Sequence, residues 1–464
     1  MGGKRQKTRP DQPELAFPEE SRGEAPRALG EGTEPSAAKR ASQSPVVTER
    51  LMEGILRTSN LQEAFKRVRA NKGSPGVDGM TVEEVQDYYR KNWPTLEPQL
   101  LAGTYEPQPV KRVEIPKPDG GVRKLGIPTA LDRVIQQAVL QVLQERWDST
   151  FSQHSFGFRP GRSAHQAVAQ AQKYLAEGYR WVVDMDLEKF FDRVNHDLLM
   201  GLLAKRITDK RVLKLIRAFL NAGVMENGLV GPTDEGTPQG GPLSPFLSNI
   251  VLDILDRELE KRGHRFVRYA DDCNIYVRSR RAGERVMANI TRFLTQRLKL
   301  KVNQDKSTVA RPWTVKFLGF SFTNGQAPKR RIAPKALARF KGRVREETRR
   351  TRGVSITTMV ADLSRYLRGW HGYFAYCETL SVLRDLDSWV RRRLRSVVWK
   401  QWKLGRVRFR ELRQRGVGKD LAAQTAGSCH GPWRLSKSPA LSYSLPNAYW
   451  VSLGLPTLAA RPAV

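Results

Sequence analysis

The 464-residue sequence contains few cysteines and no long apolar run. Its three cysteines, Cys273, Cys377 and Cys429, form no CxxC pair, which argues against a disulfide framework or a structural zinc site and fits a reducing compartment. The apolar runs are far shorter than the roughly 20 residues of a membrane-spanning helix, so we expect no membrane partner. The basic N-terminus also lacks the apolar stretch of a signal peptide, which predicts a cytoplasmic protein.

Acidic residues are scarce relative to basic ones. The chain has 80 Lys and Arg against 47 Asp and Glu, a net charge of +33. Such an excess is electrostatically costly unless a polyanion neutralises it, and nucleic acid is the first candidate. Residues 329–415 alone carry 25 Lys and Arg against 7 Asp and Glu, a net charge of +18 with tryptophans interleaved among the basic residues. This pattern favours a helical segment that binds nucleic acid.

The sequence predicts both helices and strands after an irregular N-terminal tail. Residues 1–49 are rich in Pro, Gly, Glu, Arg and Ser and predict a disordered tail. Short strand patterns occur near 110–115, 122–128 and 314–322. Apolar residues at helical spacing predict a helix over 130–146, where Thr129 and Asp132 resemble a capping box.

The segment FVRYADDCNIYV, residues 266–277, places two adjacent acids between β-branched and aromatic residues. This pattern predicts a hairpin with Asp271 and Asp272 at its tip. Two carboxylates so close repel each other by a few kcal/mol at an effective dielectric of about 20. A solvated turn would screen that repulsion, and a divalent cation would offset it, because hard cations bind carboxylate oxygens.

A second acidic segment, VVDMDLEKFFDRVNHD, begins as a buried strand. Asp184 and Asp186 lie two residues apart at its end, so both side chains point to one face. If that face meets the hairpin tip, Asp186, Asp271 and Asp272 form a cluster suited to two Mg²⁺ ions, which serve phosphoryl transfer. The alternative for Asp186 alone is a structural acid at a strand end.

Three further segments suit the binding of phosphates and nucleic acid. PKPDGGVRKLGIPT offers cations on a turn, which can clamp a triphosphate. SFGFRPGRS (155–163) is a loop too polar for a core, and GTPQGGPLSP (236–245) lets the backbone approach a ligand closely. For each segment alone, a surface cation or a plain loop is the default interpretation, but their order and spacing together argue against coincidence.

In this order the motifs resemble those of the reverse transcriptases encoded by bacterial group II introns, also called intron maturases. The matching segments are GSPGVDGMT, PDGGVRKLGIPTALDRVIQQA, SFGFRPGRS, DMDLEKFFDRVNH, GTPQGGPLSPFLSNI, YADD, LKVNQDKS and KFLGF. RYLRGWHGYF (365–374) resembles the maturase, or thumb, segment of that family. Residues 416–464 hold one His and one Cys, no ligand set for the HNH endonuclease of many relatives, and so resemble the short ending of group IIC enzymes.

The resemblance implies an α+β fold of the right-hand polymerase type, in which fingers and a palm with an antiparallel sheet precede an α-helical thumb. The domains it predicts are a disordered tail (1–49), an N-terminal extension of the fingers (50–105), fingers and palm (106–334), the thumb or maturase domain (335–415) and a short DNA-binding-like region (416–464).

The resemblance also assigns roles to individual residues. Asp186 and Asp271 would hold two Mg²⁺ ions, with Asp272 completing the catalytic set. Phe191 would lie under the incoming sugar and exclude a 2′-hydroxyl, and Lys306 would act as general acid on pyrophosphate. The predicted dNTP contacts are Lys117, Arg123, Phe191, Gln239 and Gly240. The predicted nucleic-acid contacts are Arg159, Arg162, Arg368, Trp370, Arg391, Arg392 and Arg393.

The function implied is RNA-directed DNA polymerisation from dNTPs, a primer or target DNA and group II intron RNA, together with help in splicing and mobility. The location implied is the bacterial cytoplasm, with association to the nucleoid in use. Two alternatives stay open: an RNA-binding splicing cofactor that does not polymerise, and a reverse transcriptase domesticated for host repair or defence. The intact acids argue against the first, and RYLRGWHGYF argues for an intron origin. The sequence leaves the oligomeric state open.

Overall fold

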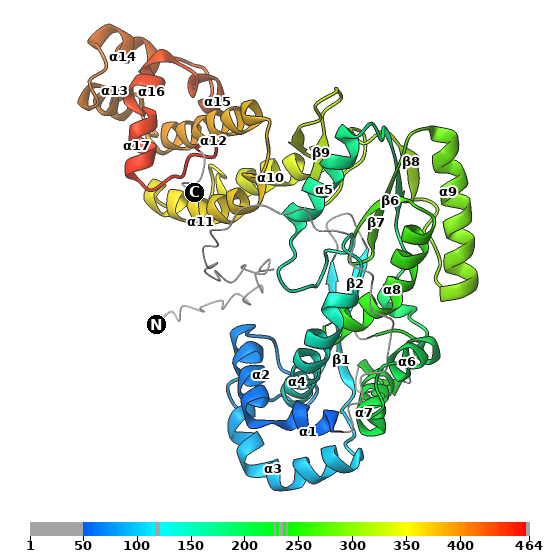
Figure 1. The fold of residues 1–464 in the computed structure, drawn as a ribbon. Helices are drawn as coiled ribbons and strands as arrows, with labels where there is room; N and C mark the ends of the chain where they lie inside the picture. Colours follow the sequence, from blue (N-terminus) through cyan, green and yellow to red (C-terminus); the bar gives the residue numbers. More distant parts are fainter. Residues whose placement is uncertain (1–49, 117–120, 227–228, 232–234, 238–239, 461–464) are drawn as a thin grey trace, which may run out of the picture. The chain divides into compact units, whose positions relative to one another are not determined.

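The structure is a computed structural model that describes residues 50–116, 121–226, 229–231, 235–237 and 240–460 (Figure 1). All of them belong to one compact unit, residues 46–464. The predicted disordered tail and two predicted dNTP contacts, Lys117 and Gln239, lie outside the described residues. The described part is an α+β fold, as predicted, with sheets in its first two thirds and a helical C-terminal third. None of its helices is long and apolar enough to cross a membrane.

Four helices belong to the first part of the described chain, and three of them pack against the fourth. They are α1 (Leu51–Leu56), α2 (Thr58–Ala70), α3 (Val85–Ala102) and α4 (Ala130–Trp147). Thr129 caps α4, because its hydroxyl oxygen accepts a hydrogen bond from the Asp132 N–H at 3.1 Å, which confirms the predicted capping residue. Most of α4 is buried, and α1, α2 and α3 all contact it. Helix α4 is therefore the centre of this helical part.

A four-stranded sheet follows, with strand order β2-β1-β4-β5. Its strands are β1 (Val110–Pro116), β2 (Val122–Ile127), β4 (Val224–Glu226) and β5 (Leu229–Gly231). Strands β1 and β2 pair antiparallel, as their position on either side of a glycine-containing turn predicts. The chain that precedes β4 forms the helices α6 (His196–Ala204) and α7 (Lys210–Asn221).

A second four-stranded sheet carries the acidic motifs. It has the order β6-β7-β3-β8, and every neighbouring pair is antiparallel. Its strands are β3 (Trp181–Met185), β6 (Arg265–Tyr269), β7 (Asp272–Val277) and β8 (Thr308–Ala310). Along β3, Val183 faces one hydrophobic core and Val182 faces another, as the alternation of side chains in a strand requires. The sheet is therefore covered on both faces.

Helices cover this sheet. They are α5 (Ala164–Ala176), α8 (Ser244–Lys261) and α9 (Arg280–Phe293), and α9 lies beside β8 (Figure 1). Gly283 allows α9 to approach closely, since a Cβ there would lie 2.5 Å from Val309 Cγ1. Three shorter helical turns complete this part: η1 (Asp148–Thr150), η2 (Phe190–Asp192) and η3 (Leu294–Leu298).

The C-terminal part is helical after a small two-stranded sheet of β9 (Phe320–Phe322) and β10 (Arg330–Ile332). The predicted strand over 314–322 is too long, because Leu318 and Gly319 adopt left-handed φ values of 49° and 81° that interrupt an extended chain. The helices are α10 (Pro334–Glu347), α11 (Ile356–Phe374), α12 (Leu380–Gln401), α13 (Gly405–Gln414), α14 (Lys419–Ala426), α15 (Pro432–Leu435), α16 (Pro439–Ser444) and α17 (Asn447–Ser452).

Candidate active site

The two adjacent acids lie at the turn between β6 and β7. Tyr269 pairs with Asp272, so Ala270 and Asp271 form the turn and Asp272 is the first residue of β7. The predicted hairpin is therefore present, with its tip one residue earlier than the sequence suggested. Ala270 has a φ of 56°, a left-handed conformation that costs a non-glycine residue about 1–3 kcal/mol. Such a turn persists only where the surrounding structure holds it.

Asp186 approaches these acids because β3 and β7 are neighbours. Met185, the last residue of β3, pairs with Cys273 of β7. The next residue of the chain is Asp186, and the residue before Cys273 is Asp272. The end of β3 and the start of β7 therefore bring the two acidic motifs to one edge of the sheet, which meets the condition that the sequence set for an acidic cluster.

The segment 303–307 fixes Asp186. The Asp186 N–H donates to Ser307 Oγ at 3.0 Å, and the Asp186 carbonyl accepts from the Asn303 N–H at 2.8 Å. The ammonium of Lys306 lies 3.9 Å from Asp186 Oδ2, with its side chain largely exposed. Asp186 and Lys306, two predicted catalytic residues, are therefore neighbours.

The three acids interact electrostatically. Desolvation raises the pKa of Asp271, and the charge of Asp186 raises it further, whereas the guanidinium of Arg123 opposes this shift. Desolvation raises the pKa of Asp272 to about 6, with the charges of Asp271 and Asp186 as further causes. Because Asp272 is exposed to solvent, screening weakens the effect there. The charge of Asp186 thus makes both Asp271 and Asp272 harder to ionise.

A fourth acid, Asp184, belongs to the same group. It is half-buried in β3, opposite Asn274 of β7 and Thr308 of β8. Desolvation, followed by the charges of Asp272 and Asp186, raises the pKa of Asp184 to about 7. Asp184 therefore adds to the negative potential at this edge of the sheet.

The carboxylates at this edge of the sheet suit a hard divalent cation that takes its remaining ligands from water and substrate. Among the described residues, no three His, Cys, Asp or Glu side chains are placed to hold a metal ion by themselves. Mg²⁺ typically takes only one or two protein carboxylates and completes its octahedron with water and substrate phosphates. The raised pKa values of Asp271 and Asp272, next to the charge of Asp186 and the exposed ammonium of Lys306, fit a site that substrate completes.

Phe191 lies against the loop that precedes α8. Its ring is half-buried in η2, while Phe190 is buried and makes an edge contact with it at 5.3 Å between ring centroids. The Phe191 carbonyl accepts from the Thr237 N–H at 2.6 Å. Gly236 has a φ of 95°, and a Cβ there would lie 2.9 Å from the same carbonyl. Only glycine at position 236 therefore allows this segment to lie so close to the Phe191 carbonyl.

The remaining predicted dNTP contacts are only partly described. Arg123 is exposed on β2, and its charge acts on Asp271. Gly240 has a φ of 144°, and a Cβ there would lie 2.6 Å from the Gly126 carbonyl oxygen of β2. Strand β2 and the loop before α8 are thus in contact near the acids.

Two predicted nucleic-acid contacts lie in the loop 155–163 and differ in their surroundings. The Arg159 guanidinium is buried, pairs with Asp148 at 2.8 Å and donates to the carbonyls of Ser152 and Ser155. These partners favour a structural role for Arg159 over the predicted contact with nucleic acid. Arg162 is half-buried and donates to Gln153, a contact that a ligand could displace.

The arginines of α12 also have partners within the protein. Arg391 lies 3.9 Å from Asp387, Arg392 lies over the ring of Trp433, and Arg393 donates to Thr348 Oγ1 at 2.7 Å. These arginines, predicted to contact nucleic acid, are therefore engaged in packing α12 against α10 and the C-terminal segment.

Arg368 and Trp370, both on α11, differ in exposure. Arg368 is exposed and makes one long hydrogen bond, to the Gly454 carbonyl at 3.4 Å. Trp370 is half-buried, with its ring 4.3 Å from that of Phe340 between centroids. Arg368 is therefore available to a ligand, whereas Trp370 belongs mainly to the helical core.

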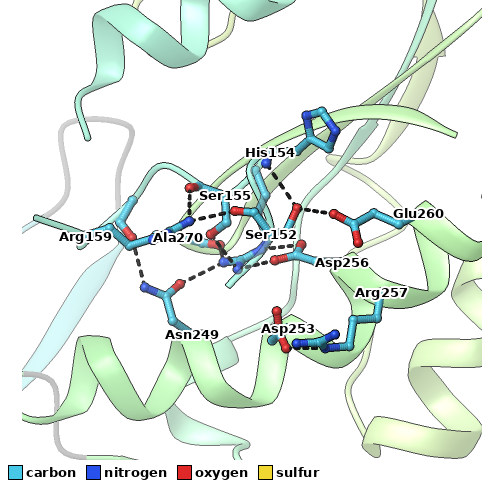
Figure 2. Close-up of polar contacts among 12 residues, drawn as sticks. Ser152, His154, Ser155, Arg159, Asn249, Asp253, Asp256, Arg257, Glu260 and Ala270 are labelled. Carbon is cyan, nitrogen blue, oxygen red and sulfur yellow. Dashed lines mark hydrogen bonds and ion pairs between the residues drawn. The ribbon is translucent and has the colours of Figure 1, made fainter. Parts of the chain in front are cut away.

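The sequence did not point to three buried polar residues: Arg268, Asn249 and Asp256. Arg268 donates to the carbonyl of Ala270 in the turn, and Figure 2 labels Asn249, Asp256 and Ala270. Asp256 lies on the face of α8 that also buries Leu252, Leu255 and Leu259. A charged residue on an apolar helix face is a recognisable signal, because an acid there needs a buried partner.

Residues 115–322 match the reverse transcriptase (RNA-dependent DNA polymerase) family, and residues 337–416 match the maturase-specific domain of group II introns. Protein YkfC of Escherichia coli (strain K12) is 34% identical over 301 residues, which cover 56% of this chain and 79% of that protein. Group II intron-encoded protein LtrA of Lactococcus lactis subsp. cremoris is 38% identical over 212 residues, 46% of this chain and 35% of LtrA. A solved chain of a partial Cas6-RT-Cas1–Cas2 complex is 25% identical and covers 53% of this chain and 42% of that chain, with a TM-score of 0.35.

An antiparallel sheet with acids at one edge, a second sheet whose strands flank β3 in the chain, and a helical C-terminal part are the architecture of right-hand nucleic-acid polymerases. Within that class, the chain belongs to the reverse transcriptase family and carries the maturase-specific domain of group II introns. The predicted family is thereby confirmed.

Proposed function

We propose that this reverse transcriptase extends a DNA primer with dNTPs on group II intron RNA, and that Asp186, Asp271 and Asp272 hold two Mg²⁺ ions for this reaction. The observation that carries the proposal is the meeting of the two acidic motifs and Lys306 at one edge of the β6-β7-β3-β8 sheet. A purely RNA-binding protein would have no use for carboxylates that destabilise one another.

In this proposal the metal ions would activate the primer 3′-hydroxyl and stabilise the leaving pyrophosphate. Arg123, whose charge already acts on Asp271, binds the triphosphate. Lys306 donates a proton to pyrophosphate, which its exposed side chain beside Asp186 can reach. Phe191 supports the sugar and leaves no room for a 2′-hydroxyl, which selects deoxynucleotides.

The proposal extends to intron RNA and to splicing. Residues 329–415 have a net charge of +18, and the maturase-specific match covers most of that segment. Because the charges of α12 are partly used within the protein, we assign RNA phosphate contacts to better exposed residues such as Arg368 and to Arg162. Assistance to splicing would follow from the same binding.

Primer extension on an RNA template tests the proposal. Purified protein is given Mg²⁺ and either dNTPs or rNTPs, beside Asp271→Asn and the control Asp197→Asn, whose side chain is exposed on α6. We expect the wild type and the control to use dNTPs alone. Asp271→Asn should lose at least about a hundredfold in rate, since a metal supplies several kcal/mol of transition-state stabilisation.

RNA binding is measured in parallel, on the same three proteins. The proposal requires Asp271→Asn to bind intron RNA as tightly as the wild type, because only chemistry is removed. If neither nucleotide is incorporated by the wild type while RNA binds tightly, the polymerase assignment fails and the splicing-cofactor reading replaces it.

A further inference from the structure

We infer that Arg268 is a positioning residue for Asp271, which it holds through the carbonyl of the strained residue Ala270. Arg268 lies on β6, three residues before Asp271. The inference deepens the proposed function, because its activity readout rests on the polymerase reaction. Its structural readout does not depend on that reaction.

The Arg268 side chain is fully buried and paired with an equally buried acid. Its Nε donates to Asp256 Oδ1 at 2.7 Å, and its Nη2 donates to Asp256 Oδ2 at 2.6 Å, with neither side chain exposed. A buried ion pair of this kind contributes little net stability compared with apolar residues of the same volume. Stability alone is therefore a poor reason for a charged pair at this position.

The remaining N–H groups of the Arg268 guanidinium bind residues in and around the turn. Nη1 donates to Asn249 Oδ1 and to the Ala270 carbonyl, both at 2.9 Å, and Nη2 also donates to Ser155 Oγ at 2.7 Å. With the two bonds to Asp256, these contacts match the five N–H donors of an arginine. Lysine has three donors and no planar fork, so it cannot reproduce this set.

Figure 2 shows that these partners converge from separate elements: Asn249 and Asp256 from α8, Ser155 from the loop before α5, and Ala270 from the turn. Asn249 and Asp256 lie about two helical turns apart on α8, and both accept hydrogen bonds from the same guanidinium. Arg268 therefore ties a helix and a loop to the acidic turn.

The loop 154–157 also contacts the turn. The Arg268 N–H donates to the His154 carbonyl, and the Phe156 N–H donates to the Arg268 carbonyl, both at 2.9 Å. Gly157 then lies so close that a Cβ there would be 2.2 Å from the Ala270 nitrogen. Asn249 Nδ2 donates to the Gly157 carbonyl at 2.9 Å, which joins this loop to the Arg268 network.

These contacts explain how Ala270 keeps a left-handed φ of 56°. Strained backbone persists at functional sites where surrounding contacts over-determine it. The peptide that follows the Ala270 carbonyl leads directly to Asp271, so a change in this carbonyl's position moves the Asp271 carboxylate. A proposed metal ligand tolerates displacements of only about 0.5 Å, which makes the network a determinant of metal affinity.

The test compares two variants with matched controls. Asn249→Ala removes one acceptor of Arg268 and the support of Gly157 but leaves the buried ion pair intact. Its control is Asn60→Ala, which removes an amide that bridges α1, α2 and α4 through Ile55 and Ala138. Arg268→Lys is compared with Arg211→Lys, which alters another arginine paired with a buried acid, Asp209.

Hydrogen exchange of the metal-free proteins is measured on peptides that cover residues 266–275. We expect exchange there to be about tenfold faster in Asn249→Ala than in the wild type, with no change in Asn60→Ala. The Mg²⁺ concentration for half-maximal primer extension should rise severalfold in Asn249→Ala and further in Arg268→Lys, and excess Mg²⁺ should restore part of the rate. The two controls should retain the Mg²⁺ dependence of the wild type.

Unchanged exchange and unchanged Mg²⁺ dependence in Asn249→Ala would overturn the inference. So would a loss of thermal stability that is equal in each variant and its control, with no difference in the other readouts. If the wild type does not polymerise, the exchange measurement still decides whether Arg268 and Asn249 hold the turn, and the failure then belongs to the proposed function alone.

Discussion

Asp184 is the residue at which the electrostatics of the site can be tested without substrate. Desolvation and the charges of Asp272 and Asp186 raise its pKa from 3.8 to about 7 in the folded state. Between these two values the folded protein binds more protons than the unfolded chain. The stability of the folded state therefore falls as the pH rises through this window, and the penalty is fully present above about pH 7.

We therefore expect Asp184→Asn to raise the melting temperature of the metal-free protein at pH 8, by a degree or more, on the order expected for partial relief of one buried charge. At pH 5 only the first part of this pH window has been crossed, so the difference in melting temperature should be clearly smaller than at pH 8. Thermal unfolding in a chelator at both pH values measures this. A difference that is equal at pH 5 and pH 8 would show that the ionised carboxylate is not the cause.

At the same scale, the sequence was a better guide to which residues are functional candidates than to which partners surround them. The acids could be found because carboxylates side by side are costly, and Lys306 does lie beside Asp186. The partners of Arg159 could not be found, because Asp148 and two backbone carbonyls reach it only in the folded chain. A basic residue in a polar loop looks the same in sequence whether it faces solvent or a buried acid.

At the scale of elements, the contact between the loop 154–157 and the β6–β7 turn depends on one missing side chain. Gly157→Ala would place a Cβ 2.2 Å from the Ala270 nitrogen, a backbone atom that cannot move aside cheaply. We expect a loss of several degrees in melting temperature, since such a clash destabilises by a few kcal/mol. Primer extension should fall with it, because the turn carries Asp271.

Gly54→Ala is the matched control for this prediction. Gly54 lies in α1, and a Cβ there would meet nothing within 4 Å. Replacing a helical glycine by alanine stabilises by roughly 0.5–1 kcal/mol, so this variant should melt at or above the wild-type temperature. If Gly157→Ala behaved like Gly54→Ala, the close approach of loop and turn would be wrong.

Elements were predictable where one local rule decided them. The periodic apolar residues and the cap at Thr129 located α4 to within one residue of its end. The pairing of β3 with both β7 and β8, by contrast, joins segments separated by more than 80 residues, and no local pattern specifies it. The edge at which the acids meet is a product of that pairing, so the sequence could state it only as a condition.

At the scale of the whole molecule, charge predicted the class of partner but not the contact surface. The net charge of +33 points to a polyanion. Part of the basic excess nevertheless serves internal packing, because Arg392 lies over Trp433 and Arg415 over Trp402. A count of arginines therefore overstates the number of phosphates that the protein can contact.

The salt dependence of RNA binding measures that number directly. Each phosphate contact contributes about −0.7 to −0.9 to the slope of log K against log salt concentration, so several contacts give a steep slope. We expect Arg368→Gln, which removes an exposed charge on α11, to reduce the slope by about 1. Asp271→Asn should leave the slope unchanged, because the role proposed for Asp271 is to bind Mg²⁺, and its carboxylate neutralises no phosphate. A wild-type slope near zero would contradict binding through charge, and an unchanged slope in Arg368→Gln would move the RNA surface away from this face of α11.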